Sequence, residues 1–212
     1  MKTIALFLFI LPLIPADQGS SYLEKIPAYS IDSYFKQQVY TDKDWKAFYK
    51  MDEPQKKVDP HHYDLHLLNA AFFYASNKLR NDKKLPPLEF AGGLRNAALL
   101  HTNEMITRNF FDHYNKKDRK FYAPDQRMKL FINQPTFSAE NCDENFVADN
   151  ESITYIQLAE RVVKHLYDSP PHRANLLSKQ VKYMGCAIMF SAPKPKLNAT
   201  YLKATQDFTS NI

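Results

Sequence analysis

The segment Tyr183-Met184-Gly185-Cys186-Ala187-Ile188-Met189-Phe190 decides the fold class, because it is an apolar run without a single charged residue. A short apolar run bounded by polar residues and rich in β-formers predicts a buried strand. Pro193-Lys194-Pro195 then predicts a turn, and residues 201–208 predict a strand that returns beside the first. The end of the chain is therefore expected to form a sheet.

Working outward from this sheet, three long segments have helical spacing of apolar residues. The first begins at Asp64 and ends before Pro86-Pro87, the second follows Gly92-Gly93 and ends near Phe110-Phe111, and the third covers residues 153–167. Shorter helices are predicted near residues 43–51 and 173–177. Helices followed by a few late strands predict an α+β fold, a mixed helix-and-sheet sandwich.

Composition limits the possible functions. The 212 residues are 44% hydrophobic and 24% charged with a net charge of +5, which is typical of a folded domain and does not indicate a nucleic-acid binder. The four glycines fit neither a dinucleotide fingerprint nor a phosphate loop. Gly-x-Ser-x-Gly and His-Glu-x-x-His motifs do not occur, so two common hydrolase classes lack support in the sequence.

The first 16 residues resemble a secretory signal peptide. Lys2 precedes an apolar run from Ile4 to Ile14, and Pro15-Ala16 ends it. A retained anchor is the alternative, although the run is shorter than the roughly 20 residues of a membrane-spanning helix. We expect a secreted, extracellular protein that does not span a membrane.

Export affects the interpretation of Cys142 and Cys186. An oxidising compartment favours a disulfide between them, and two buried free thiols are the alternative. Two cysteines are too few for a thiolate zinc site of the CxxC…CxxC kind.

Three polar residues are candidates for chemistry. His113 and His172 each follow a predicted helix end, and Glu140 follows a short predicted strand at residues 136–139. If they converge, they supply a zinc-type ligand set or an acid and a base; otherwise they are unrelated polar residues. His101 lies on the apolar face of its helix and is expected to be a core histidine, and His165 is expected to be exposed.

The segment 114–135 is polar and is expected to be a loop. Its basic run Lys116-Lys117-Asp118-Arg119-Lys120 lies between Tyr114 and Phe121-Tyr122. It is either a contact surface or simply a solvated loop.

Several ordered motifs together resemble the CAP superfamily, the cysteine-rich secretory, antigen 5 and pathogenesis-related proteins, in its bacterial-type (SCP) branch. They cover about residues 64–210. The motifs are Leu85-Pro86-Pro87-Leu88, His101-x-x-x-Met105, Asn109-Phe110-Phe111-Asp112-His113, Ala139-Glu140-Asn141, Ser169-Pro170-Pro171-His172-Arg173-Ala174-Asn175-Leu176-Leu177, Met184-Gly185-Cys186-Ala187 and Ala204-Thr205-Gln206-Asp207-Phe208.

The resemblance implies a three-layer α-β-α sandwich with a cleft over the sheet, where two histidines and two acids bind zinc in some members. His113 matches the first histidine and Glu140 the acid of the Gly-Glu-Asn motif, whose glycine is Ala139 here. Ser169 and Lys203 stand at the second acid and the second histidine, which disfavours tight metal binding. His172 belongs to the bacterial-type Pro-Gly-His-Arg motif, with Pro171 for the glycine. Supporting roles around this cleft are expected for Asn141, Arg173, Gln206 and Asp207.

The expected domains are a signal peptide (1–16), an N-terminal extension (17–60) that packs through its aromatic residues, and a CAP domain (61–212). The expected function is a secreted, non-enzymatic binding module for a small apolar molecule, a lipid, an extracellular protein or a cell-wall component. The alternative is a zinc-dependent hydrolase that uses His113, Glu140 and His172, with zinc-bound water as nucleophile.

Overall fold

The computed structural model describes residues 20–133, 135–192 and 198–212. The predicted signal peptide and the predicted turn at 193–195 lie outside these residues. The α-helices are α1 (Ser20–Leu23), α2 (Gln38–Asp42), α3 (Trp45–Tyr49), α4 (Leu65–Asp82), α5 (Gly92–Thr107), α6 (Pro124–Met128), α7 (Tyr155–Asp168) and α8 (Pro170–Leu176). The strands are β1 (Glu89–Phe90), β2 (Ala139–Ala148), β3 (Tyr183–Phe190) and β4 (Ala199–Thr209). Short 3-10 turns lie at Pro27–Ser30, Tyr34–Lys36, Glu53–Gln55 and Arg119–Phe121.

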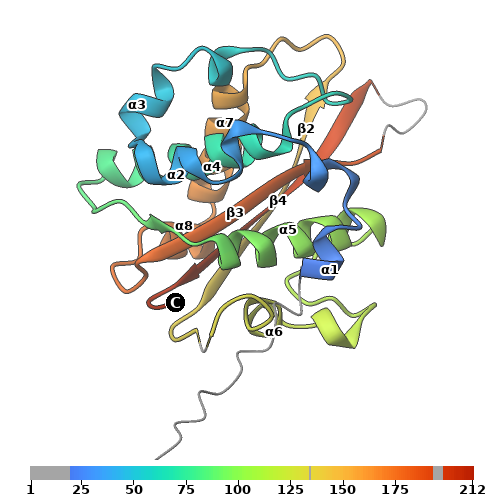
Figure 1. Ribbon diagram of the computed structural model, residues 1–212, viewed down its shortest axis with the longest axis vertical. Helices are drawn as coiled ribbons and strands as arrows, with labels where there is room; N and C mark the ends of the chain where they lie inside the picture. Colours follow the sequence, from blue (N-terminus) through green and yellow to red (C-terminus); the bar gives the residue numbers. More distant parts are fainter. Residues whose placement is uncertain (1–19, 134, 193–197) are drawn as a thin grey trace, which may run out of the picture.

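The four strands form one sheet in the order β1-β3-β4-β2. The β3–β4 and β4–β2 pairs are antiparallel, and β1 pairs with β3 in parallel. In Figure 1 the strands run diagonally, with α4 and α7 on one side and α5 and α6 on the other. The three-layer α-β-α sandwich predicted from the sequence is confirmed.

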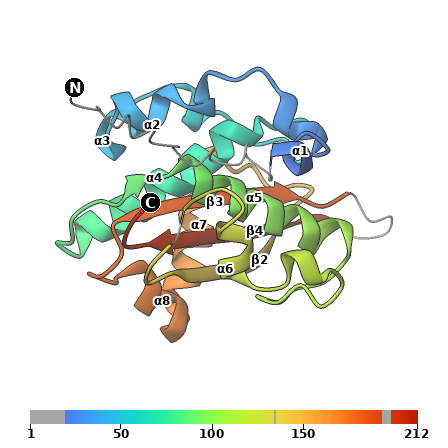
Figure 2. The ribbon, with the colours of Figure 1, turned by 60° about the horizontal axis from the view of Figure 1, so that its bottom comes forward.

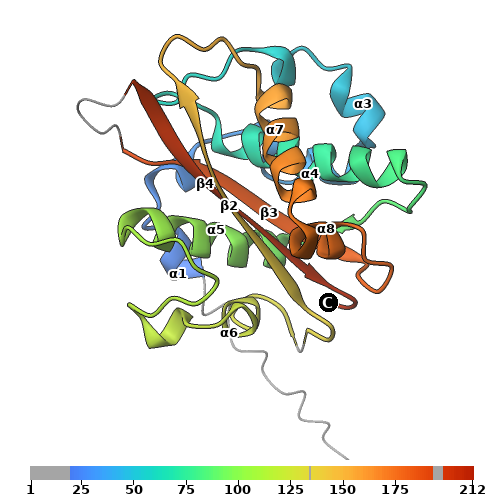
Figure 3. The ribbon, with the colours of Figure 1, turned by 180° about the vertical axis from the view of Figure 1, so that it is seen from behind.

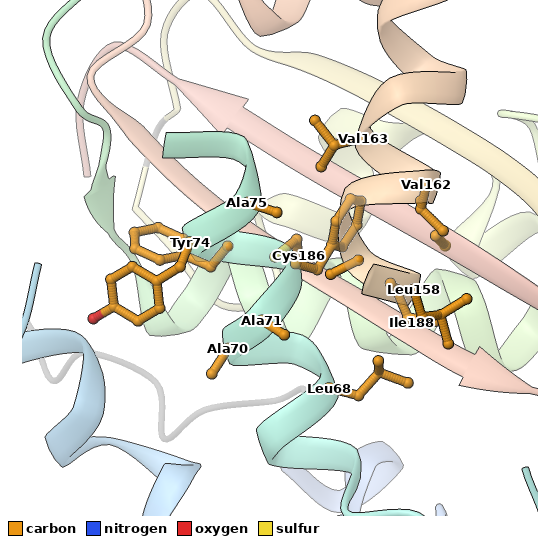
Figure 4. Close-up of a cluster of buried hydrophobic side chains, with 14 of the residues drawn as sticks. Leu68, Ala70, Ala71, Tyr74, Ala75, Leu158, Val162, Val163, Cys186 and Ile188 are labelled. Atoms are coloured by element: carbon orange, nitrogen blue, oxygen red, sulfur yellow. The ribbon is translucent and has the colours of Figure 1, made fainter. Parts of the chain in front are cut away.

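Alternation along β3 and β4 divides the core between the two faces. Met184, Cys186 and Ile188 pack against α4 and α7, and Figure 4 shows the last two among side chains of these helices. Ala187 and Met189 point to the other face and pack with residues of α5. Helix α7 is amphipathic and starts at a capping box between Thr154 and Gln157, which explains why the helical spacing was readable in its sequence.

Close contact between α5 and β3 requires Gly185. A Cβ atom at this position would lie 1.9 Å from the backbone nitrogen of Arg95, far inside van der Waals contact. The glycine therefore lets the helix backbone lie directly on the strand.

The segment between residues 20 and 58 packs on the sandwich rather than standing apart from it (Figure 2). Phe35, Val39 and Phe48 are buried in the core that contains α4, and Leu23 and Ile26 are buried with residues of α5. The predicted helix near residues 43–51 is α3, whose N-cap Asp44 accepts a hydrogen bond from the backbone of Ala47.

Arg80 ties three segments together at the end of α4. Its side chain is 1% exposed and donates to the carbonyl oxygens of Pro86, Leu176 and Ser178 at 2.8–3.0 Å. Burial lowers the pKa of this guanidinium. The loop after α4 and the residues that follow α8 are therefore held by one charged side chain.

Three predicted boundaries were wrong. The strand expected at 136–139 is β2, which begins at Ala139, so Glu140 lies at the start of a strand and not at its end. Pro170 and Pro171 do not separate two helices by a loop, because proline fits the first turn of α8, which begins there (Figure 3). The segment 114–135 contains α6 in addition to loop.

Candidate functional site

A cluster of polar side chains lies on the α5 face of the sheet, at the start of β2. Glu140 and Cys142 come from β2, and His101 comes from α5. Arg127 comes from α6, and His113 lies in the loop after α5. Residues far apart in the sequence therefore meet at the edge of the sheet.

Both carboxylate oxygens of Glu140 have a partner. Oε1 accepts a hydrogen bond from His113 Nδ1 at 2.9 Å, and Oε2 accepts one from Arg127 Nη2 at 2.6 Å. The Glu140 side chain is 2% exposed. Its burial favours the neutral acid, but His113, His101 and Arg127 outweigh this and hold the pKa of Glu140 below its usual range. A buried ion pair therefore occupies the acidic position of the cluster.

Arg127 is the functional-site residue that sequence reasoning missed. Besides Glu140, its guanidinium donates to the carbonyl oxygens of Phe121, Tyr122 and His113 at 2.8–3.1 Å. The side chain is completely buried. In the sequence it is one arginine in a basic loop, and no spacing distinguishes it from its exposed neighbours.

His113 and His172 lie side by side at the more open end of the cluster. Their ring centroids are 6.2 Å apart, and the His113 side chain is 41% exposed. The hydrogen bond to Glu140 raises the pKa of His113, while burial and the charge of His113 lower the pKa of His172. The three predicted site residues thus form a row, in which Glu140 contacts His113 and His113 neighbours His172.

His101 is a core histidine, as expected. It is fully buried, and its Nε2 donates to the backbone oxygen of Asp112 at 3.0 Å. Burial lowers its pKa to about 4, so the ring is neutral near pH 7. His101 Nε2 lies 3.8 Å from Glu140 Oε1, which places this ring beside the ion pair.

Asp207 lies directly opposite Glu140 in the β2–β4 register and is completely buried. Apart from the neighbouring Glu140 carboxylate, neither of its carboxylate oxygens has a hydrogen-bond partner among the described residues. Burial and the neighbouring charge of Glu140 raise the pKa of Asp207 well above its usual range. The two facing carboxyls therefore have pKa values shifted in opposite directions, raised for Asp207 and lowered for Glu140.

Asn141 and Gln206 belong to a second polar network, on the opposite face of the sheet. Asn141 Nδ2 donates to Gln206 Oε1 at 3.1 Å and to the backbone oxygen of His172 at 3.2 Å. Gln206 donates in turn to Ser76 Oγ on α4. These two residues tie α4, α8 and the sheet together, and the contacts of Gln206 are with Ser76 and Asn141 rather than with a histidine ring.

Ser169, Arg173 and Lys203, which the family resemblance also singles out, contact groups other than Glu140 and Arg127. Arg173 donates to the backbone oxygen of Tyr167 at 3.1 Å, and Ser169 is the N-cap residue of α8. Lys203 Nζ donates to the carbonyl oxygens of Met105 and Phe110 and lies 3.3 Å from Glu144. His165 is exposed, as expected, and pairs with Asp143 at 2.5 Å.

The predicted disulfide between Cys142 and Cys186 was wrong, since both are buried free thiols. Cys142 pairs with Thr205 of β4, and Cys186 pairs with Gln206 of the same strand, so β4 separates them. Two strand spacings amount to about 10 Å, whereas a disulfide needs Cα atoms within about 7 Å. The two thiols also point to opposite faces of the sheet.

The residues present do not fit a zinc centre of the expected kind. Ligand atoms of His101, Glu140 and Cys142 lie within 4.8 Å of one another. However, the Arg127 guanidinium already neutralises Glu140 from 2.6 Å. Burial and the Glu140 charge raise the pKa of the Cys142 thiol, which keeps it protonated. In the expected set of His113, Glu140 and His172, the Glu140 carboxylate is held at Oε2 by Arg127 and at Oε1 by His113.

Two cavities lie elsewhere on the molecule. One of about 550 Å³ lies between the α2–α3 segment and the α4–β1 segment. Another of about 300 Å³ lies between α4 and α7, where Leu79, Val163 and Tyr167 contribute to its wall.

The comparison with protein families decides the identity of the fold. The model of the cysteine-rich secretory protein family, CAP, matches residues 73–203, more than half of the chain. This chain is a CAP protein. None of the curated proteins matches it.

Three solved structures are similar to this chain. An outer surface protein of Borrelia burgdorferi superimposes with a TM-score of 0.53 at 15% identity, over 74% of this chain and 98% of that one. An extracellular SCP-domain protein of Bacillus anthracis has a TM-score of 0.48 at 20% identity, over 69% of this chain and 41% of that one. A cysteine-rich secretory protein of Staphylococcus aureus has a TM-score of 0.44 at 16% identity, over 69% of this chain and 39% of that one. Within the described residues of this CAP protein, no helix combines the length and apolarity needed to cross a membrane.

Proposed function

We propose that this CAP protein is an extracellular binding module without catalytic chemistry of its own. The observation that carries the proposal is the buried ion pair between Glu140 and Arg127, with Oε1 of the same carboxylate bound by His113. A hydrolytic centre needs an activated nucleophile or an open metal position. Glu140 is engaged at both oxygens, and the Cys142 thiol is held protonated.

The metal-dependent hydrolase is therefore not favoured. In its ligand set Glu140 would share its charge between the metal ion and Arg127, which already neutralises this carboxylate from 2.6 Å.

Binding of a small apolar or amphipathic ligand is supported by the cavity of about 550 Å³, a volume within the usual range for small-molecule sites. An extracellular location is supported by the leader-like first 16 residues, by the secretory character of the family and by the outer-surface relative.

Native mass spectrometry of the purified protein, with a denatured spectrum of the same sample, tests the proposal. We expect a mass excess of organic size that disappears on denaturation, and zinc well below one atom per chain by elemental analysis. Stoichiometric zinc, lost in His113→Ala/His172→Ala and retained in the exposed-site control His62→Ala, would instead establish a metal centre.

A docking surface for an extracellular partner is a second candidate. Phe111, Tyr114 and Tyr122 are 39–49% exposed beside the basic run of residues 116–120. Cross-linking to extracellular material, compared between the wild type and Tyr114→Ser/Tyr122→Ser, tests this surface. Unchanged cross-linking in the variant would count against it.

A further inference from the structure

A buried histidine joins the first described residues of the chain to the sandwich. The cover segment, residues 20–30, contains α1 and the 3-10 turn at Pro27–Ser30 and lies beside α5 (Figure 1). His66, in the first turn of α4, is 1% exposed, and its Nε2 lies 3.2 Å from the backbone oxygen of Tyr29 in this segment. A side chain of the sandwich therefore holds the backbone of the cover segment.

The contacts of the His66 ring require its neutral form. Nδ1 lies 3.2 Å from Arg95 Nη1 on α5. A guanidinium can only donate, so Nδ1 is the unprotonated nitrogen, and Nε2 carries the hydrogen that is donated to Tyr29. A second proton on the ring would remove the acceptor of Arg95 and bring two cations into contact.

Arg95 has no acidic partner that would tolerate this second cation. Its side chain is buried, its Nη2 donates to the neutral Asn96 Oδ1, and its Nε has no hydrogen-bond partner among the described residues. The guanidinium also lies over the Tyr29 ring, 5.5 Å from the centroid. The same cation therefore contacts both His66 and the cover segment.

The other charges around His66 do not compensate for Arg95. Asp64 is an acid that favours the protonated ring, but its carboxylate already accepts hydrogen bonds from backbone nitrogens at the start of α4. Lys36 adds positive charge, Glu24 and Lys25 of the cover segment are exposed, and β3, which packs against α4, carries no charged residue. Burial and the Arg95 charge together lower the pKa of His66 to about 4.

The cover segment also hides an apolar surface. Leu23 and Ile26 are almost completely buried, in one cluster with Leu99, Leu100 and Phe121. These apolar contacts do not depend on pH, whereas the contact with His66 does. Release of the segment would uncover the side of α5 that carries Leu99.

We infer that residues 20–30 are an acid-released cover of α5: protonation of His66 breaks its contacts with Tyr29 and Arg95, the segment detaches, and the apolar surface beneath it becomes accessible. The inference goes beyond the proposed binding function and uses neither the cavities nor the cluster around Glu140.

The size of the effect follows from proton linkage. The pKa of His66 is about 4 with the segment in place, and a ring freed from it has the ordinary value of 6.5. Because the docked form has the lower pKa, docking is at full strength above the higher value. It weakens about tenfold for each pH unit between the two values and no further below the lower one. From pH 7 to pH 5 the docking equilibrium should therefore fall about 20-fold.

Hydrogen exchange followed by mass spectrometry measures docking directly. The backbone nitrogens of Lys25, Ile26 and Tyr29 are hydrogen-bonded within the cover segment. Their protection, corrected for the intrinsic exchange rate at each pH, reports how often the segment is docked. We expect this protection to fall about 20-fold from pH 7 to pH 5, while amides inside α4 and α7 keep theirs.

His66→Gln tests the origin of the pH dependence. A glutamine side chain can donate to Tyr29 and accept from Arg95 but does not titrate, so the variant should keep the segment protected at pH 5. The control His62→Gln removes a histidine whose side chain is 85% exposed, and it should behave like the wild type.

Segment protection that stays constant between the two pH values would overturn the inference. So would an equal loss in His66→Gln, or a loss shared with α4 and α7, which would be ordinary acid unfolding. The comparison of the cover segment with α4 and α7 is made in the wild type, so it stands even where His66→Gln does not fold.

Discussion

Arg127 Nη2 lies 2.6 Å from Glu140 Oε2, and both side chains are sealed from solvent. The guanidinium supplies within the fold the positive charge that a metal ion would supply at an acidic site. It also donates hydrogen bonds to the backbone carbonyl oxygens of residues 113, 121 and 122, so the loop around α6 is fixed to the sheet edge through this one side chain.

Arg127→Met should destabilise the protein strongly. The substitution leaves Glu140 buried with its Oε2 unpaired, and loss of one partner of a buried pair costs about 3–5 kcal/mol. Urea denaturation measures the effect, and the exposed Arg119→Met should change stability by less than about 0.5 kcal/mol. If Glu140→Gln in the Arg127→Met background does not recover stability, the cost arises from packing and not from the unpaired charge.

Asp207→Asn should remove a loss of stability that begins as the pH rises above the unfolded-state pKa of this aspartate. The folded-state pKa of Asp207 is raised, so its contribution to stability is fully present below the unfolded-state pKa and is lost as pH rises through the folded-state value. Asparagine cannot ionise, and the variant should therefore keep its stability at high pH better than the wild type.

Urea midpoints from mildly acidic to alkaline pH check this expectation, with the exposed Asp32→Asn as control. Parallel curves for Asp207→Asn and the wild type would show that Asp207 is ionised in the folded protein at neutral pH.

Cys142 and Cys186 should react as two free thiols per chain when the protein is unfolded without reductant. In the folded protein both should resist alkylation, because both are buried and burial raises the pKa of each thiol. Titration with a thiol reagent, with and without denaturant, gives the two counts. A count near zero in denaturant would mean that the thiols are oxidised.

Gly185→Ala should be among the most damaging single substitutions, whereas Gly92→Ala should be tolerated. The added methyl would lie 1.9 Å from the Arg95 nitrogen in the first case and 3.9 Å from a Phe90 side-chain carbon in the second. Overpacking usually costs about 1–3 kcal/mol, and a clash with backbone lies at or above the top of that range. Thermal unfolding compares the pair, and similar melting temperatures would contradict the close contact of α5 with β3.

The sequence predicted the long helices and the central strands because their burial is periodic. α4 and α7 repeat apolar residues every third or fourth position, and β3 is apolar throughout because helices cover both faces of the sheet. β2 was only partly predicted, since the run Glu140–Glu144 is polar although four of these five residues are buried. Their burial depends on partners from other elements, which local pattern does not show.

The candidate site was predictable only where a motif marked it. His113 and Glu140 belong to such motifs and do meet. Arg127 is specified by tertiary contacts alone, and the pairing of Cys142 and Cys186 depends on strand order, which cysteine spacing does not reveal. The cavity beside Trp45 was also not predictable, because it arises where the N-terminal segment meets α4 and β1.

Arg80 has a consequence for how the structure opens. The loop after α4 and the residues around the end of α8 both accept hydrogen bonds from its guanidinium, so release of either segment leaves buried donors of Arg80 unpaired. Amide hydrogens in these two distant stretches should therefore exchange with solvent as one cooperative unit. The end of the bacterial-type His172-Arg173-Ala174-Asn175-Leu176 motif should then be as protected from exchange as α4, whose Arg80 binds it.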